Sequence, residues 1–303
     1  MHKKNQNHSK LFLFLFSLAL LSAFYSLPSW SQTKVLKADQ KRYPIENKQI
    51  NESSGLACST RNKKVLWTHN DSGHMPIIYA LDLKGKDLGT FYLDDIQSND
   101  WEDMDAFEYQ GEHYLLIADT GDNFRFRWDY QITIIKEPPL KNNFNNTLRN
   151  TFKNGSSAIS PVWSFVFKYE NNKSYDVEAV AVDSVREKII LLSKHTPHAY
   201  LFELPLIPPD NGQMPVAVKV AELNDIVKPS ALDINADGTL MSINTYARIH
   251  RFRRYDPDNS WRYEHSLKYK NLFQPEAMCL GTDEKHYFVS SEKKSYLLKI
   301  KAQ

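Results

Sequence analysis

Three glutamates and one aspartate stand where short apolar segments begin. Glu102 and Asp103 precede Met104, Glu178 precedes an Ala-Val pair and Glu276 precedes an Ala-Met pair. Carboxylates held close together repel one another, so such a group is costly unless a cation, hydrogen bonds or water offset the charge. Calcium and other hard cations take oxygen ligands of this kind. We therefore expect Glu102, Asp103, Glu178 and Glu276 to bind a divalent cation, with calcium as the first candidate. The alternative for Glu178 and Glu276 is that they only accept hydrogen bonds from backbone amides of a neighbouring strand.

Further polar or aromatic side chains flank these segments and are candidates for contact with a ligand. They are Asn70, Asp71, Trp101, Asp119, Asp122, Asn123 and Glu292. Each has a structural alternative. The composition of Asp119-Thr120-Gly121-Asp122-Asn123 is typical of a turn, and Trp101 is of the type that packs inside a sheet. The segment lacks the final glutamate of a calcium-binding EF-hand loop, which excludes that motif.

Three side chains near the same group have the chemistry for proton transfer. His69, Lys194 and His195 follow apolar segments, and each is a candidate to move a proton or to hold an anionic substrate beside a metal-activated water. The sequence has no Gly-rich phosphate loop before a helix and no HExxH, CxxC or GxSxG motif. Several common enzyme classes therefore lose their usual sequence support.

The elements that carry these residues form a repeat. Two apolar strand-like segments, separated by a turn, recur five times, and the five copies begin at Ser54, Glu102, Glu178, Ser230 and Glu276. Neighbouring copies start 46 to 52 residues apart, apart from one interval of 76 that contains an Asn-rich segment, 141–157. Each copy is followed by further strand candidates, and long helical periodicity is absent. A period near this length, built from short strands, is typical of propeller blades.

We therefore predict an all-β protein, a five-bladed β-propeller, with six blades as the alternative if the long interval hides another. In a propeller the innermost strand starts at one face and the second strand returns to it, so the candidate residues converge around the central channel. The last copy ends after Ile300 without a fourth strand. We expect segment 33–43 to supply that outer strand, which would close the ring and cover an exposed edge.

The first thirty-one residues have the layout of a signal peptide. Lysines precede an apolar run from Leu11 to Phe24, and Ser29 and Ser31 stand before a cut preceding Gln32. The alternative is an uncleaved anchor, but the run is shorter than a membrane-spanning helix needs. Removing three lysines leaves 35 basic and 36 acidic residues, which gives no support for binding nucleic acid. We expect a signal peptide, 1–31, and a single propeller domain, 32–303, with no membrane span after cleavage.

The chain has two cysteines, Cys58 and Cys279. Aligning the first and last repeats puts Cys279 level with Ala57, so the two cysteines point from opposite faces of their strands. In a five-bladed ring the first and last blades are neighbours, and this offset permits contact. We predict a disulfide or a close approach, and two buried free thiols are the alternative.

Four blocks resemble a family of exported bacterial β-propeller proteins of largely unassigned function. They are Ser54-Gly55-Leu56, Leu66-Trp67-Thr68-His69-Asn70-Asp71-Ser72-Gly73, Asp100-Trp101-Glu102-Asp103 and Ile117-Ala118-Asp119-Thr120-Gly121-Asp122-Asn123. The resemblance covers about residues 52 to 125 and is only repeat-like beyond. More distantly, the chain is similar to SdiA-regulated periplasmic propellers and to gluconolactonase-like, calcium-dependent propellers. The close resemblance implies the fold and export, and the distant one implies a divalent ion at the channel mouth. Ser54 and Ser230 replace Glu in two repeats, so such an ion would be held asymmetrically.

These observations predict a monomeric periplasmic or secreted protein that binds a small molecule, a glycan or a protein partner at an acidic, cation-binding channel mouth. The alternative is a metal-assisted hydrolase, of lactonase or phosphoesterase type, that uses the same site. Fold alone does not choose between them, because propellers host both kinds of function.

Overall fold

Strands make up nearly all the regular structure in the part of the chain that the computed structural model describes, residues 34–140, 159–195, 197–208, 210, 212–246, 248–255, 260–270 and 273–302. Within these ranges, the other element is a single 3-10 turn, η2 (Glu170–Asn172), and no helix has the length and apolar character to cross a bilayer. The expected signal peptide and the Asn-rich segment 141–157 lie outside the described residues. The chain is therefore all-β, as the sequence predicts.

The strands form antiparallel groups of four that follow one another along the chain. The first sheet contains β3 (Ser53–Cys58), β4 (Val65–Asn70), β5 (Ile77–Asp82) and β6 (Asp87–Tyr92). An eight-stranded sheet holds two such groups. One is β7 (Trp101–Tyr109), β8 (Glu112–Asp119), β9 (Tyr130–Lys136) and β10 (Trp163–Tyr169). The other is β11 (Val177–Asp183), β12 (Lys188–Ser193), β13 (Ala199–Pro205) and β14 (Val216–Leu223). A short parallel pairing of the outer strands β10 and β14 joins these two groups.

The remaining two sheets each take a strand from the start of the described chain. β15 (Ala231–Ile234), β16 (Leu240–Thr245), β17 (Arg248–Arg253) and β18 (Arg262–Lys268) are extended by β1 (Val35–Lys37), which pairs parallel to β18. β19 (Pro275–Leu280), β20 (His286–Ser291) and β21 (Tyr296–Lys301) are completed by β2 (Gln40–Pro44). β2 pairs antiparallel to β21, from Gln40 opposite Ile300 to Pro44 opposite Tyr296. The early segment thus forms the outer strand of the last sheet, as expected.

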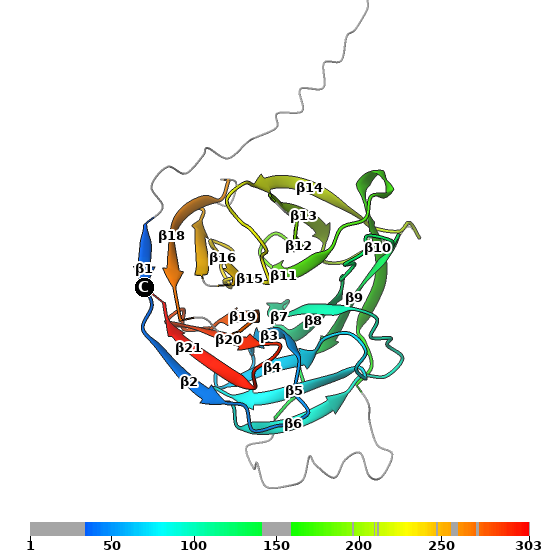
Figure 1. The fold of residues 1–303 in the computed structure, drawn as a ribbon. Coiled ribbons are helices and arrows are strands. Elements are labelled where there is room, and N and C mark those ends of the chain that lie inside the picture. The colour runs from blue at the N-terminus through cyan, green and yellow to red at the C-terminus, as the bar shows by residue number, and fades with distance from the viewer. Residues whose placement is uncertain are drawn as a thin grey trace, which may run out of the picture.

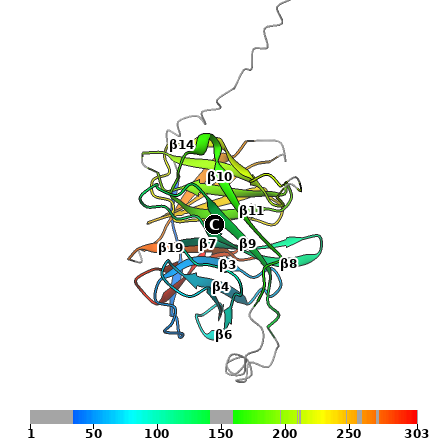
Figure 2. The same ribbon diagram turned by 90° about the vertical axis from the view of Figure 1, so that its right-hand side faces the viewer.

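The first strand of each group lies near the centre of the molecule. β3 contacts β7, β7 contacts β11, β11 contacts β15, β15 contacts β19, and β19 returns to β3, so these contacts close a ring. Figure 1 shows the inner strands around the middle, with β6, β14, β1 and β2 outermost. In the turned view of Figure 2, β3, β4 and β6 follow one another outward from the middle. A closed ring of radial antiparallel sheets is the architecture of a β-propeller.

Hydrophobic clusters fill the spaces between neighbouring sheets. Leu66 and Phe288 belong to the cluster between the first and last sheets, and Phe167 and Phe202 belong to the cluster between the halves of the eight-stranded sheet. All residues of β3, β11 and β19 are buried, because these strands pack on both faces. Continuous apolar runs, rather than strict alternation, follow from burial on both faces.

A disulfide joins the first and last sheets. Cys58 at the end of β3 bonds to Cys279 in β19, with their Cα atoms 5.6 Å apart and a separation of 221 positions in sequence. Both cysteines belong to the cluster between these two sheets. The prediction that the two cysteines approach each other is therefore confirmed. They point from opposite faces of their own strands, and those two faces meet in the space between the first and last sheets. A disulfide is compatible with an oxidising, extracytoplasmic compartment.

Candidate functional site

A β-bulge lies at the start of four inner strands and skips one residue in each. The skipped residues are Ser54 in β3, Glu102 in β7, Glu178 in β11 and Glu276 in β19. A bulged residue is left out of the ladder, and the bulge bends the strand and re-aims that side chain. β15 pairs with β16 without such a shift, and Ser230 stands just before it. In these four strands, the polar residue that begins the repeat is therefore the one that the bulge leaves out of the ladder.

Five carboxylates gather where β7 and β11 begin; we call them the carboxylate cluster. Oxygen atoms of Asp71, Asp100 and Glu102 all lie within 4.8 Å of one another, and so do oxygen atoms of Glu102, Asp176 and Glu178. Glu102 belongs to both groups. Asp71 follows β4, while Asp100 and Asp176 come just before β7 and β11. The loop after β4 and the starts of β7 and β11 therefore supply the cluster.

Burial and mutual repulsion favour the protonated forms of these carboxyl groups. Burial, followed by the charges of Glu178 and Asp71, raises the pKa of Glu102 well above its ordinary value. Burial and Asp71 raise the pKa of Asp100 to about 6. A cation bound among these oxygen atoms would offset the repulsion and restore the charged forms.

The two halves of the cluster differ in their counter-charge. Lys194 Nζ lies 2.7 Å from Glu178 Oε1, so the second group already has a cation. Burial raises the pKa of Glu178 to about 8 although Lys194 opposes this. Burial lowers the pKa of Lys194, but Glu178 and Glu276 act against burial and the net pKa of Lys194 is raised. No salt bridge from a described residue reaches Asp71, Asp100 or Glu102. The first group is therefore the better place for an additional cation.

Gly121 brings the backbone close to this first group. The N–H groups of Thr120 and Gly121 donate to the Asp100 carbonyl oxygen, each at 3.2 Å. A Cβ atom at Gly121 would collide with the carboxylates of Glu102 and Asp100. Only glycine leaves these oxygen atoms free beside the turn. The donor set of carboxylate oxygens with nearby backbone fits a hard divalent cation such as calcium.

Glu276 lies at the same end of the channel but outside both groups. Its side chain is buried, and Oε2 has no hydrogen-bond partner among the described residues. Burial raises the pKa of Glu276 to about 7, opposed by Lys194 and supported by Glu292. Glu292 is partly exposed at the rim and accepts a hydrogen bond of 2.9 Å from Gln274 Nε2. Glu276 thus contributes negative charge and an unpartnered oxygen to the mouth.

Asp103, expected as a metal ligand, lies deeper in the channel and binds backbone amides instead. Its Oδ1 accepts from its neighbour Met104 at 2.9 Å. Its Oδ2 accepts from the Val180 N–H at 2.9 Å and from the Leu232 N–H at 3.4 Å. Because inner strands have an unpaired edge, these bonds satisfy amide groups of β11 and β15. Both carboxylate oxygens of Asp103 thus accept backbone N–H groups, and Asp103 belongs to neither group of oxygen atoms around Glu102 among the described residues; an ion at Asp103 stays a prediction.

Three of the expected ligand-contacting residues hold the mouth together. Asn70 Nδ2 donates to the Gln49 carbonyl at 2.7 Å. Asp119 forms a salt bridge of 2.7 Å with Arg127 and accepts the Asn99 N–H at 2.8 Å. All three side chains, Asn70, Asp119 and Asp122, are buried. Their hydrogen bonds are directed to the protein, so their roles in the described structure are to position loops.

The loop after β8 presents exposed aromatic side chains beside the cluster. Phe124, Phe126 and Trp128 are 79%, 84% and 72% exposed, which is unusual for such large apolar groups. Asp122 fixes this loop, because its carboxylate accepts the Phe126 N–H at 2.8 Å and the Arg127 N–H at 3.0 Å. The loop starts at Gly121, next to the carboxylates. A rigid aromatic surface therefore borders the acidic mouth, and the exposed Asn123 lies within it.

The remaining predicted residues divide between the core and the rim. His69 is fully buried, and Trp101, 1% exposed, meets it edge to face at 5.3 Å. Burial lowers the pKa of His69. Neither ring has a surface to offer a ligand. His195 is at the rim, where its Nδ1 lies 2.7 Å from the Arg125 guanidinium, and burial and Arg125 lower its pKa. Of the residues expected to transfer protons, Lys194 and His195 therefore lie at the mouth.

Asp100 and Asp176 were missed by the sequence reasoning. That reasoning took the first residue of each repeat, whereas these two stand two residues earlier than Glu102 and Glu178. The signal was the pattern Asp-x-Glu, which occurs at both positions. Including the two residues directly before each predicted inner strand would have identified Asp100 and Asp176.

Comparison with known proteins adds no family. No protein-family model matches the chain, and no curated protein matches it. Among solved structures, the chain is similar to a functionally unknown protein from Desulfotomaculum acetoxidans DSM 771, with 12% identity and a TM-score of 0.42, over 79% of this chain and 65% of that one. It is also similar to the β-propeller domain of Myceliophteria thermophila Cps50 (Swd1), with 9% identity and a TM-score of 0.43, over 83% of each chain. The chain spans less than two thirds of the first protein. The architecture therefore rests on the strand pairing and the inner ring described above.

Proposed function

We propose that this chain is an exported five-bladed β-propeller that holds a divalent cation, calcium by preference, at Asp71, Asp100 and Glu102, and binds a ligand or partner there. The closed ring of inner strands supports the blade count. The order of charge, apolar run and small residues in 1–31 supports export, and the Cys58–Cys279 disulfide is in keeping with it.

One observation carries the cation proposal. Asp71, Asp100 and Glu102 present oxygen atoms within 4.8 Å of one another, and no salt bridge within the described ranges neutralises them. Glu178 has Lys194 for this purpose. A calcium ion held there would supply coordination positions for oxygen atoms of a small molecule, a glycan or a protein.

The aromatic loop supports a binding role. Phe124, Phe126 and Trp128 are exposed on a loop whose backbone Asp122 holds through the Phe126 and Arg127 N–H groups, so part of the backbone entropy cost of ordering this loop is already met in the free protein. Large aromatic side chains are typical anchors of binding surfaces. The acidic mouth and this loop together form the face to which we assign the partner.

Thermal unfolding with and without calcium tests the proposal. An ion that binds only the folded chain stabilises it by about 2.7 kcal/mol at a hundred times its Kd. For a chain of this size we expect a rise in Tm of about 5 to 10 °C, reversed by chelator. Asp100→Asn should cut the rise to about half or less at the same calcium concentration, because it removes one ligand charge and keeps the shape, and a tenfold weaker affinity leaves about 1.4 kcal/mol of stabilisation.

Glu112→Gln is the matched control, since Glu112 is exposed at the other end of the β7–β8 hairpin from Glu102 and forms a salt bridge with Lys136. It should keep the full calcium response. A Tm that neither calcium nor chelator moves would contradict the cation proposal, and the cluster would then be held by protonation and hydrogen bonds alone.

A further inference from the structure

A cavity lies at the opposite end of the channel from the carboxylate cluster, and we call it the axial cavity. Its volume is about 460 Å³, and its lining includes Cys58, Asp105, Val182, Asp233 and Leu280, one from the far part of each inner strand. Since these strands begin at the carboxylate cluster, their ends mark the other mouth. The volume is in the range of small-molecule sites.

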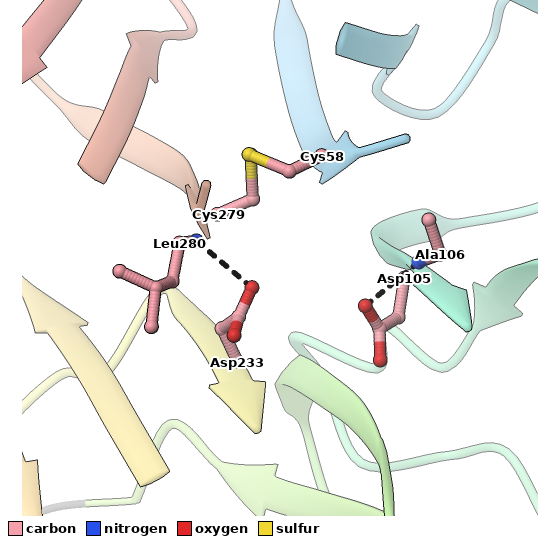
Figure 3. Close-up of a disulfide and its surroundings, with 6 residues drawn as sticks. All are labelled: Cys58, Asp105, Ala106, Asp233, Cys279 and Leu280. Atoms are coloured by element: carbon pink, nitrogen blue, oxygen red, sulfur yellow. Dashed lines mark hydrogen bonds between the residues drawn. A yellow bond between two sulfur atoms is a disulfide. The ribbon is translucent and has the colours of Figure 1, made fainter. Parts of the chain in front are cut away.

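Two buried carboxylates line this cavity. Asp105 and Asp233 are only 7% and 8% exposed. Figure 3 shows their side chains approaching from β7 and β15, beside the disulfide. Asp105 uses both oxygen atoms, accepting the Ala106 and Val182 N–H groups, each at 2.7 Å. Both carboxylates are thus held in place by backbone donors.

Asp233 keeps one oxygen free for a ligand. Its Oδ2 accepts the Leu280 N–H at 2.9 Å, and no described residue donates to Oδ1. Neither Asp233 nor Asp105 has a salt bridge within the described ranges. A buried carboxylate with an open oxygen and no counter-charge is costly unless a cation pairs with it.

The charges around the cavity add to this demand. Burial and the proximity of Asp233 raise the pKa of Asp105 well above its ordinary value, and burial raises the pKa of Asp233 to about 7, with Glu284 adding to it. Glu108 and Glu284 also line the cavity, and Lys63 is the one lysine or arginine among its lining residues within the described ranges. Lys63 is exposed, at the edge. In the empty cavity, protonation relieves the repulsion between the two carboxyl groups, and a bound cation would favour their charged forms instead.

The lining also has an apolar part. Phe107, Ile234 and Leu280 line the cavity among its polar and charged residues, and a short hydrocarbon can pack against them. A bare metal ion fits less well, because three of the four carboxylate oxygens of the pair already accept backbone N–H groups. Asp105 and Asp233 also belong to no group of three metal-ligating side chains in the described part of the chain.

We propose that the axial cavity binds a small organic cation, a primary ammonium or guanidinium group on a short hydrocarbon, with the charged group between Asp233 and Asp105. An ammonium or guanidinium donates to Asp233 Oδ1 in a charge-assisted hydrogen bond. The hydrocarbon part contacts Phe107, Ile234 and Leu280. This site is separate from the carboxylate cluster and does not depend on the cation proposed there.

Calorimetry with simple probes tests the proposal on the full chain. n-Butylamine, benzylamine and butylguanidine are each titrated, with 1-butanol and benzyl alcohol as neutral counterparts. At least one cation should bind at least tenfold more tightly than the alcohol of the same shape. This comparison uses the wild-type chain alone and needs no variant to fold.

Variants then locate the site. Asp233→Asn keeps an oxygen for the Leu280 N–H but removes the charge, and should weaken binding of the cation at least tenfold; Asp105→Asn is the second variant. Asp100→Asn and Glu112→Gln should leave the affinity unchanged. The proposal is overturned if no cation is preferred over its alcohol, or if both cavity variants bind it as the wild type does. Calcium binding that is lost in Asp233→Asn and kept in Asp100→Asn would also overturn it, because the cavity would then be a metal site.

Discussion

Reducing the Cys58–Cys279 disulfide should destabilise the propeller strongly, because this bond closes the ring between its first and last sheets. The cysteines are 221 residues apart. In the loop-entropy relation, a cross-link over a loop of that length restricts the unfolded chain by about 5 kcal/mol at 25 °C. The β2–β21 pairing also closes the ring, so the folded chain should survive reduction. We expect the oxidised protein to be more stable by about 3 to 5 kcal/mol.

The assay is equilibrium unfolding in guanidinium chloride with and without reductant, alongside a Cys58→Ala/Cys279→Ala variant. The reduced wild type should shift its midpoint downward. The double variant should unfold at least as early and should not respond to reductant. Equal midpoints for oxidised and reduced wild type, with thiol titration proving reduction, would refute the argument that the bond acts across the ring closure.

Three other predictions concern the ring and the carboxylate cluster. A truncation starting at Ser53 removes β1 and β2 and should aggregate, since it uncovers the edge of β21; a monomer of unchanged stability by light scattering and thermal unfolding would contradict this. Gly121→Ala should weaken calcium binding at least tenfold in calorimetry, because its Cβ would press on Glu102 and Asp100, and an unchanged affinity would exclude that contact. The pKa values of Asp100, Glu276 and Glu178 are raised to about 6, 7 and 8, so the folded state binds their protons more tightly than the unfolded state does. This stabilisation is present in full below about pH 4 and is lost as pH rises through 6 to 8. In chelator, Tm should therefore fall between pH 5.5 and 8, and calcium should reduce that fall; a rising Tm would show that the cluster is not protonated when free of metal.

The architecture could be read from the sequence because each repeat carries its own local signal. Strand pairs recur at nearly constant spacing, and a ring of like units leaves little choice of arrangement. The early strand β2 was predictable for a related reason, since the last repeat lacks an outer strand and the edge after Ile300 must be covered. Side-chain alternation permitted the disulfide without requiring it, because Cys58 and Cys279 are offset by one position between equivalent strands, and the structure shows the bond.

The site was only partly predictable because a bulge changes which neighbour faces the mouth. Glu102 and Asp103 are adjacent carboxylates of similar chemistry. The bulge turns Glu102 toward Asp71 and Asp100, while Asp103 points along the channel to the Val180 N–H. Nothing in a two-residue acidic pair shows where the ladder skips. The axial cavity was not predicted either. Asp105 and Asp233 are 128 positions apart in sequence, inside strands whose other residues are mostly apolar, and only the fold brings them to one cavity.

The central claim is that Asp71, Asp100 and Glu102 hold a calcium ion, and calorimetric titration of chelator-treated protein measures this directly. One ion should bind per chain, with affinity at least tenfold weaker in Asp100→Asn and unchanged in Glu112→Gln. No binding at millimolar calcium, or equal binding by Asp100→Asn and the wild type, would contradict the claim.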